Sequence, residues 1–342
     1  MHNDDRSDFY QDHLDRVSRS FAFCIARLDN PLREWVGLSY LLCRIVDTIE
    51  DAAWPVFTDQ ERAFTFFESF LERKPQASEI EAWTQLFPHE GLPESETELL
   101  KDAYPLFCDY HGLPPEIRES LRDPILSMSR GMRFFMTKKN REGVLRLRNL
   151  ADVNRYCFFV AGVVGEILTR LVKRENAPGL IDAFRFGLFL QKVNLLKDQN
   201  GDETHGRFLV PSRSLVLRSL IEDARIAFDY VQSLPKAEVG YRLFCSWSLF
   251  LGLASLPWIE RGYRGEGPGK IPREETYQIL GFVDENIGDQ AALADLFERL
   301  LRAIEIPSEA ERVFEESAES LQELSSLYKG ELSPAEVAEL LS

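Results

Sequence analysis

Residues 38–51, LSYLLCRIVDTIED, decide the fold class of this chain. The apolar side chains that set the pattern are Leu38, Leu41, Leu42, Ile45 and Ile49. Intervals of three and four place such residues on one face of an α-helix. The same spacing recurs in residues 21–28 and 186–196, and alternating runs rich in Val, Ile and Thr are nearly absent. The sequence therefore predicts an all-α protein.

Length and composition describe an ordinary globular protein. The chain has 342 residues, of which 44% are hydrophobic and 28% are charged, as in folded domains and unlike disordered chains. Its Pro- and Gly-rich stretches are too short to be linkers and no solenoid repeat occurs, so we expect a single domain over residues 1–342. The net charge of −16 argues against a nucleic-acid partner, because that binding depends on clustered Lys and Arg.

The cysteines and the apolar runs indicate the compartment. The five cysteines are scattered and no two form a CxxC pair, which is typical of free thiols in a reducing compartment. The N-terminal residues MHNDDRSDFY are acidic and lack the pattern of a signal peptide. The longest uncharged run, residues 243–259, is short for a membrane span and contains Ser and Pro, so a buried core helix is favoured. We expect a cytoplasmic protein whose membrane contact, if any, is peripheral and at the inner face.

The C-terminal segment, residues 301–342, carries ten acidic and three basic residues. Its apolar residues Val313, Leu321, Leu324 and Leu327 keep a helical spacing. This pattern predicts an amphipathic helix with an acidic solvent face, docked on the domain, and a disordered acidic tail is the alternative.

Three carboxylates end the first apolar helix, at Asp47, Glu50 and Asp51. Positions i, i+3 and i+4 share a helix face, so these acids project into one small volume. Like charges in one place are unfavourable unless a cation compensates them. Mg²⁺ suits the site because it takes oxygen ligands from one or two carboxylates and from substrate phosphates. For this cluster taken alone, a solvated helix end is the alternative.

A second acidic face follows the apolar run GLFLQKVNLLK at residues 187–197. Asn194, Asp198 and Asp202 are spaced by four and therefore line one face of a helix. Two helices that each end in carboxylates can face each other across a cavity and bind divalent ions from both sides. Such ions would neutralise a diphosphate as it leaves its substrate. A polar helix C-terminus is the alternative, although acids there oppose the helix dipole.

Cationic residues accompany both acidic faces, namely Arg19, Arg44 and Arg207. Forked hydrogen bonds from guanidinium groups would hold diphosphate oxygens, and a simple salt bridge is the alternative for each arginine taken singly. A basic stretch stands out in this acidic chain and contains Lys138, Lys139, Arg141, Arg146 and Arg148. It predicts either a flap over an anionic site or a solvated basic loop.

Four segments, in this order, resemble the squalene/phytoene synthase family. They are Ser-Arg-Ser-Phe at 18–21, Tyr40 with residues 44–51, YCFFVAGVVG at 156–165, and GLFLQKVN at 187–194 with the two aspartates that follow. The resemblance covers about residues 9–265, which we take as the motif-bearing core. It implies an isoprenoid-synthase bundle of helices around a central apolar cavity. The 24 Phe residues agree with a dry cavity for carbocations, although Phe-rich helices are also plain core.

The resemblance further implies a squalene synthase-like reaction. Two molecules of farnesyl diphosphate would join head to head, with Mg²⁺ or Mn²⁺ helping one diphosphate to ionise. The allylic cation then attacks the other chain, and proton loss gives presqualene diphosphate. In a second half-reaction this intermediate ionises, rearranges and takes a hydride from NADPH. We expect a monomer.

Roles for individual residues also follow from the resemblance. The expected catalytic residues are Tyr40, Arg44 and Tyr156, of which Tyr156 would assist proton transfer or steady the cation. The expected diphosphate-binding residues are Ser18, Arg19, Ser20, Arg44 and Arg207. The expected metal-binding residues are Asp47, Glu50, Asp51, Asn194, Asp198 and Asp202. The expected NADPH-binding residues are Asn194, Phe244, Lys270 and Arg273. The expected cavity residues are Phe21, Val160, Ala161, Gly162, Leu188 and Gln191.

Several positions depart from the usual squalene-synthase pattern. Gly201 stands where an acid is usual, Lys197 stands where Arg is common, and Phe244-Cys245 is not followed by Pro-Gln. These departures leave open a non-reducing relative that makes presqualene diphosphate, dehydrosqualene or phytoene. No GxGxxG follows a strand, so NADPH would bind on the helical domain itself. A non-catalytic helical relative is a further alternative, but it predicts the loss of metal-binding acids that this sequence retains.

Overall fold

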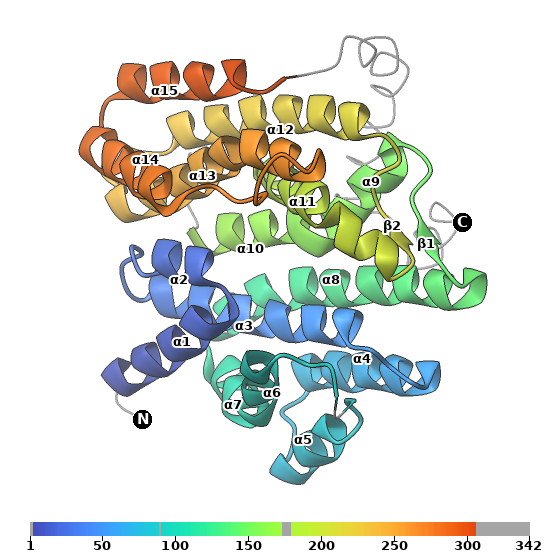
Figure 1. The fold of residues 1–342 in the computed structure, drawn as a ribbon. Coiled ribbons are helices and arrows are strands. Elements are labelled where there is room, and N and C mark those ends of the chain that lie inside the picture. Colours follow the sequence, from blue (N-terminus) through green and yellow to red (C-terminus); the bar gives the residue numbers. More distant parts are fainter. Residues whose placement is uncertain (1–2, 89, 173–178, 306–342) are drawn as a thin grey trace.

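The computed structural model of the chain describes residues 3–88, 90–172 and 179–305 (Figure 1). The first helices are α1 (Asn3–Val17), α2 (Arg19–Ile25), α3 (Leu32–Asp51), α4 (Phe57–Glu72), α5 (Ala77–Thr84), α6 (Glu94–Lys101), α7 (Ala103–Gly112) and α8 (Pro115–Glu142). They are followed by β1 (Leu145–Arg146), α9 (Leu150–Cys157), the π-helix η1 (Phe158–Gly162), α10 (Val163–Val172), α11 (Leu180–Thr204) and β2 (Arg207–Phe208). The last helices are α12 (Arg213–Ser233), α13 (Val239–Tyr263), α14 (Arg273–Asn286) and α15 (Gln290–Arg302).

The all-α prediction is confirmed, since helices dominate the described residues. The predicted acidic helix of residues 301–342 lies almost wholly outside them, because the description ends at residue 305. The single-domain organisation stays a prediction.

The long helices stack in layers. In Figure 1, α4–α7 form the bottom of the stack, α3 and α8 lie above them, α10 and α11 follow, and α12–α15 form the top. The contacts follow this order, because α3 packs on α8, α8 on α10, α10 on α11, and α11 on both α12 and α13. One cluster of buried hydrophobic side chains runs through all these layers. The two helices with acidic faces, α3 and α11, thus belong to neighbouring layers of one core.

Helix α11 contains the whole second acidic face. It runs without interruption to Thr204, so Asn194, Asp198 and Asp202 occupy successive turns of a regular helix, as their spacing predicted. The chain leaves the helix through Gly206, whose φ of +71° favours glycine. The next residue, Arg207, begins strand β2.

The two short strands were not predicted from the sequence. They pair in parallel, with Leu145 opposite Arg207 and Arg146 opposite Phe208, and two residues are too few to produce a period-2 pattern. The basic stretch is therefore not a free loop, because its first part, residues 138–142, ends α8 and Arg146 belongs to β1. The Arg146 guanidinium lies 4.0 Å from the centre of the Phe208 ring, which is a cation–π contact.

Helix α13 contains the long uncharged run. Within the described residues it is the one helix long and apolar enough to cross a membrane, and 67% of its most apolar window is buried in the protein. Most residues of the run, from Leu243 to Ile259, are buried. The predicted core helix is therefore confirmed, and membrane contact stays a prediction.

Close packing between α11 and η1 depends on Gly187. A Cβ atom at this position would lie 2.4 Å from the carbonyl oxygen of Ala161 and 2.7 Å from the Cα atom of Gly162. Both neighbours are backbone atoms, so they cannot move aside as a flexible side chain would. The absence of a side chain at residue 187 therefore sets the distance between the two helical segments that form one wall of the cavity described below.

We expect the substitution Gly187→Ala to destabilise the protein, because overpacking of a tight contact costs about 1–3 kcal/mol. The matched control is Gly201→Ala on the same helix, where an added Cβ meets no atom within 4 Å. Alanine there should stabilise the helix by up to about 1 kcal/mol. Urea unfolding of both variants measures the difference. A Gly187→Ala variant as stable as the wild type would contradict the close contact.

Candidate functional site

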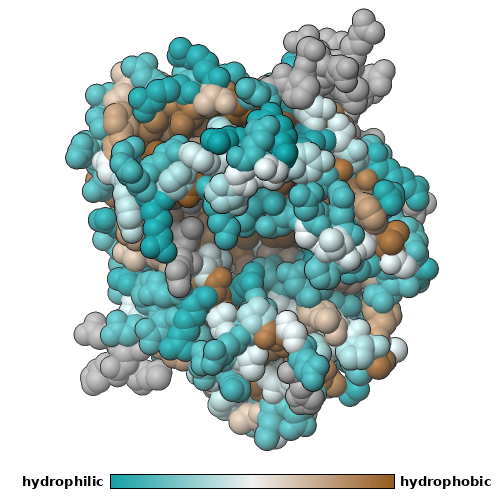
Figure 2. All heavy atoms as spheres, viewed as in Figure 1, coloured by the Kyte–Doolittle hydropathy of each residue, from teal (hydrophilic) through white to brown (hydrophobic). Residues whose placement is uncertain are grey.

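A cavity of about 670 Å³ opens between α2, α3, η1, α10, α11 and α13. This size lies within the range typical of ligand sites. Figure 2 shows a hollow near the middle of one face, with hydrophilic residues around it. One end of the cavity is polar and the other is lined by apolar side chains.

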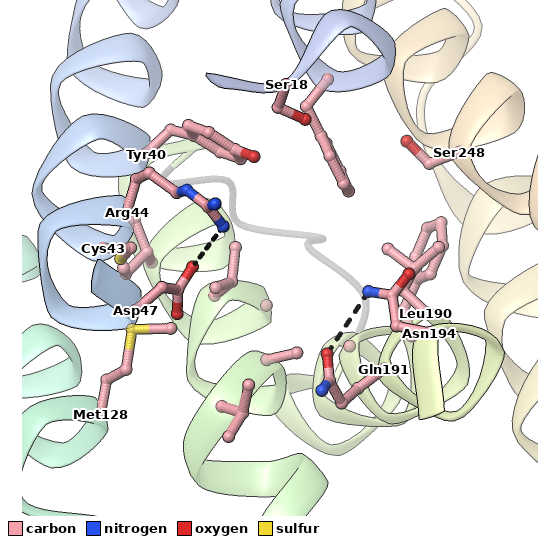
Figure 3. A pocket seen from close by; sticks show the side chains of 18 of the residues that line it. Ser18, Tyr40, Cys43, Arg44, Asp47, Met128, Leu190, Gln191, Asn194 and Ser248 are labelled. Carbon is pink, nitrogen blue, oxygen red and sulfur yellow. Dashed lines mark hydrogen bonds and ion pairs between the residues drawn. The ribbon is translucent and has the colours of Figure 1, made fainter. Parts of the chain in front are cut away.

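Both predicted acidic faces line this cavity. The lining includes Asp47, Glu50, Asp51, Asn194, Asp198 and Asp202. The first three come from α3 and the last three from α11. In Figure 3, Asp47 and Asn194 lie on opposite sides of the same space. The structure therefore brings together all six residues of the predicted metal set, although metal binding by them stays a prediction.

Arg207 lies between the two acidic faces. Its Nη1 atom is 2.5 Å from Asp51 Oδ1 of α3, and its Nε atom is 3.5 Å from Asp202 Oδ1 of α11. Its Nη2 atom donates a hydrogen bond of 2.7 Å to the Tyr156 hydroxyl. Burial by itself lowers the pKa of Arg207, but Tyr156 and the surrounding carboxylates more than offset this effect. Arg207 is therefore a fixed cation that joins α3, α9 and α11.

Tyr156 is buried beneath the carboxylates, with 1% of its surface exposed. Its hydroxyl donates to Glu50 Oε1 at 3.1 Å and accepts from Arg207. The ring of Phe135 packs edge-on against it, with 5.1 Å between ring centres. Burial first, and then the negative charge of Glu50, raise the pKa of Tyr156 well above its usual value. A neutral phenol at this position can exchange a proton while its oxygen faces the Arg207 cation.

Three acids of the site, Asp47, Glu50 and Asp202, have raised pKa values. Burial is the largest cause that raises the pKa of Asp47 to about 8, while Arg44 opposes it and Asp51 and Glu50 add to it. Burial likewise raises the pKa of Glu50 to about 7, against the effect of Arg207. The pKa of Asp202 is also raised, mainly by burial. The site therefore favours either protons or a bound cation.

Arg44 lies on the cavity wall beside the first acidic face (Figure 3). Its Nη1 atom is 3.6 Å from Asp47 Oδ2, and its Nη2 atom pairs with Glu96 of α6. Tyr40 and Ser18 complete this part of the lining. Burial raises the pKa of Tyr40 to about 12, although a hydrogen bond with Ser18 acts in the opposite direction. Glu96 was not predicted as a site residue, because nothing local in residues 94–101 marks it.

The far end of the cavity is apolar. Its lining includes Phe21, Ile25, Val160, Ala161, Phe186, Leu190 and Phe244. Tyr230 and Tyr241 also line it, and their hydroxyl oxygens are 2.6 Å apart. No local pattern marks these tyrosines, which lie on α12 and α13 and meet only in the folded chain.

Two predicted cavity residues are corrected by the structure. Gly162 does not line the cavity, because its Cα atom faces Gly187 of α11 in the close contact between these helices. Leu188 is also absent from the lining and is buried at 1% exposure. The cavity face of α11 passes through Gly187, Gln191 and Asn194, which are spaced by four and three. The structure thus places Gln191 in the cavity lining.

Other predicted site residues lie elsewhere or outside the description. Lys270 and Arg273 are exposed in the loop before α14 and at its first residue, and neither lines the cavity. Binding of NADPH by these two residues stays a prediction. The side chains of Arg19 and Ser20 lie outside what the structure describes, so their role in diphosphate binding also stays a prediction.

The donor atoms of the site fit a hard divalent cation. Among the described residues, no three His, Cys, Asp or Glu side chains are grouped closely enough to form a ready-made metal site. The acids instead lie on two helices across a cavity and supply only oxygen ligands. Mg²⁺ commonly binds through one or two carboxylates and completes its shell with water and substrate phosphates. This arrangement therefore suits Mg²⁺ that arrives with a phosphorylated substrate.

Comparison with known proteins identifies the relatives of this chain. A family model described as squalene/phytoene synthase matches residues 14–249. The squalene synthase of Eremothecium gossypii is 32% identical over 207 residues, which are 58% of this chain and 44% of that protein. The squalene synthase of Schizosaccharomyces pombe is 30% identical over 204 residues, which are 58% of this chain and 42% of that protein. The chain thus spans less than half the length of these curated relatives.

Solved structures share the fold. A complex of TcSQS with the ligand BPH1237 superposes with a TM-score of 0.67 at 23% identity, and covers 91% of this chain and 99% of that chain. A dehydrosqualene synthase in complex with a ligand gives a TM-score of 0.54 at 15% identity, over 83% of this chain and 97% of that chain. These similarities confirm the predicted isoprenoid-synthase bundle.

The raised carboxyl pKa values predict a pH effect on stability. In the unfolded chain these acids lose their protons at about pH 4, whereas folded Asp47 keeps its proton to about pH 8. A group whose pKa is raised by folding stabilises at low pH, and this contribution is lost as the pH rises through the folded value. We therefore expect the difference in unfolding free energy between the wild type and Asp47→Asn, measured in EDTA, to become less favourable to the wild type as the pH rises from about 5 to about 8.

Urea unfolding at several pH values measures this difference, and Asp59→Asn on α4, outside the cavity lining, serves as the control. Saturating Mg²⁺ should weaken the pH dependence of the wild type. A difference between wild type and Asp47→Asn that stays constant with pH would contradict the raised pKa.

Proposed function

Because the chain belongs to the squalene/phytoene synthase family, we propose that it joins two farnesyl diphosphates head to head and reduces the product to squalene with NADPH. The observation that carries this proposal is the pair of acidic faces on α3 and α11 that share one cavity with an apolar far end. A diphosphate with a long hydrocarbon chain matches both ends of this cavity. The named squalene synthases among its relatives support the same conclusion.

The polar end would bind the diphosphates. Asp47, Asp51, Asp198 and Asp202 would hold Mg²⁺, which when bound neutralises the phosphate oxygens and assists departure of the diphosphate. Arg44 and Arg207 would donate hydrogen bonds to the same oxygens. The Nε atom of Arg44 is buried and has no hydrogen-bond partner among the described residues, and the buried Nε atom of Arg207 has only the long contact of 3.5 Å with Asp202 Oδ1. A buried donor of this kind is unfavourable by about 1–3 kcal/mol, and an incoming phosphate oxygen would satisfy it.

The apolar end would hold the hydrocarbon chains. A carbocation formed there survives only if water is excluded. The lining at that end is mainly Phe, Val, Ala and Leu side chains, and the hydroxyls of Tyr230 and Tyr241 there are hydrogen-bonded to each other. The faces of Phe21 and Phe186 would also attract a passing cation. The cavity thus separates charge neutralisation at one end from cation rearrangement at the other.

Tyr156 lies near the boundary between these two ends. Its neutral hydroxyl, held by Glu50 and Arg207, would accept a hydrogen bond or relay the proton that leaves when the cyclopropane ring closes. Glu50, with its pKa near 7, is an acceptor for that proton within hydrogen-bond distance. In this proposal Glu50 is primarily a partner of Tyr156, because Tyr156 and Arg207 already engage its carboxylate.

The reductive step has weaker support than the condensation. Phe244 and Asn194 line the cavity, where a nicotinamide ring would reach them, and NADPH use is the expectation drawn from the family resemblance. Lys270 and Arg273, however, are exposed and outside the cavity lining. This placement favours, as the second candidate, a non-reducing relative that stops at presqualene diphosphate, dehydrosqualene or phytoene.

We further propose farnesyl diphosphate as the substrate of a monomeric, cytoplasmic protein that touches the membrane only peripherally. Its hydrocarbon product is insoluble in water, so release into lipid is favoured. The burial of α13 in the protein core supports peripheral contact over a membrane span.

Product analysis tests the function. Purified protein with farnesyl diphosphate and Mg²⁺ should release squalene when NADPH is present, and presqualene diphosphate or dehydrosqualene when it is absent, as measured by gas chromatography of the organic extract after phosphatase treatment. Geranylgeranyl diphosphate in a parallel reaction measures the preference for chain length. Identical products with and without NADPH would establish the non-reducing alternative, and no condensed product would refute both.

The second acidic face is tested by Asp198→Asn. This side chain is 54% exposed, so the substitution should leave the helical circular dichroism unchanged. Turnover should fall at least a hundredfold, because the face loses a charged metal ligand. The matched control is Glu203→Gln on the same helix, which lies outside the cavity lining and should retain near-normal turnover. Equal activities of the two variants would contradict a role for Asp198 in metal binding.

A further inference from the structure

Arg44 is held from two directions. Its Nη1 atom faces Asp47 at 3.6 Å, and its Nη2 atom is paired with Glu96. Its Nε atom is buried without a hydrogen-bond partner. Because Arg44 lines the cavity, the weakly held Nη1 atom is the part of the guanidinium available to an anion there.

Glu96 approaches Arg44 from outside the cavity. Its side chain is 7% exposed and does not belong to the cavity lining. It lies on α6, which packs against both α1 and α3. An ion pair between Arg16 and Glu98 and a hydrogen bond between His13 and Asp102 also hold this part of the fold. Glu96 is therefore a fixed carboxylate behind the guanidinium group, 52 positions away in sequence.

The two partners of Arg44 are not equivalent once a ligand binds. Asp47 belongs to the acidic face that is proposed to hold Mg²⁺, and a carboxylate that ligates a cation is a weaker partner for a neighbouring arginine. Glu96 cannot reach the ligand, because it does not line the cavity, so it remains available throughout. A buried carboxylate carries a large desolvation cost, which the pairing with Arg44 offsets.

We propose that Glu96 is a positioning residue that holds Arg44 towards the diphosphate of the substrate. This inference rests on the proposed function only for the identity of that anion. Arginine has a long side chain whose rotamer freedom opposes a single conformation. Pairing of Nη2 with Glu96 fixes the orientation of the planar guanidinium, so that Nη1, which is held only weakly by Asp47, is presented to the cavity.

The direction in which loss of Glu96 changes anion affinity distinguishes a positioning role from a simple electrostatic one. Removing a negative charge close to an anion site would by itself strengthen anion binding. Removing the group that orients Arg44 would weaken it. The two explanations for any effect of Glu96 therefore predict opposite changes in affinity.

Binding of inorganic diphosphate in the presence of Mg²⁺, measured by calorimetry on the full chain, provides the test. The variants are Glu96→Ala, Arg44→Ala and the double substitution, with Glu98→Gln on the same helix as the matched control. We expect Glu96→Ala to weaken binding about tenfold, Arg44→Ala to weaken it at least as much, and the double variant to bind no more weakly than Arg44→Ala. Glu98→Gln should bind as the wild type does. Glu96→Asp should recover part of the loss.

Unchanged or tighter binding by Glu96→Ala would overturn the proposal, and so would additive losses in the double variant, because residues that act through one another are not additive. If Glu96→Ala does not fold, as judged by circular dichroism, Glu96→Gln carries the same test with an expected loss of about threefold. A wild type that binds diphosphate but makes no condensed product would refute the proposed function and leave this inference standing. A wild type that binds no diphosphate would refute both.

Discussion

Carboxylates from two different helices face a single cavity, and the rest of the site is arranged around their mutual repulsion. Arg207 compensates part of this charge, because it reaches Asp51 on one helix and Asp202 on the other. Burial compensates another part by raising the pKa of Asp47 and Glu50, so that these groups hold protons near neutral pH. The negative charge that remains favours binding of a divalent cation, which would enter together with a diphosphate.

The backbone is shaped to keep this arrangement in place. The short parallel pair of β1 and β2 fixes the position of Arg207, and the close contact at Gly187 brings α11 against the π-helix η1. A π-helix is rare and often occurs at functional sites, and here it contributes Val160 and Ala161 to the cavity wall. Charged and apolar requirements thus meet in one cavity because the same helices, α3 and α11, carry an apolar face that continues into an acidic one.

Most of the fold and much of the site could be predicted from the sequence. Helical spacing correctly gave an all-α protein, and the intervals between Asp47, Glu50 and Asp51 correctly placed these acids on one face, because such patterns depend only on the geometry of a single helix. The basic residues of 138–148 were partly misread as a loop, and Gly162 and Leu188 were wrongly placed in the cavity wall. These errors concern which side of a packed helix faces which neighbour, and no local pattern encodes that.

The sequence by itself determined the helices, the two acidic faces and membership of the family, since each is written in short segments of the chain. Only the tertiary structure decided that Glu96 lies behind Arg44, that Arg207 bridges both acidic faces, and that Tyr230 meets Tyr241 at the apolar end. Ion pairs and hydrogen bonds between distant residues need a distance of about 3 Å, and sequence separation says nothing about that distance. The packing of the helical layers sets this distance, whereas the spacing of residues within each helix is already fixed by its own sequence.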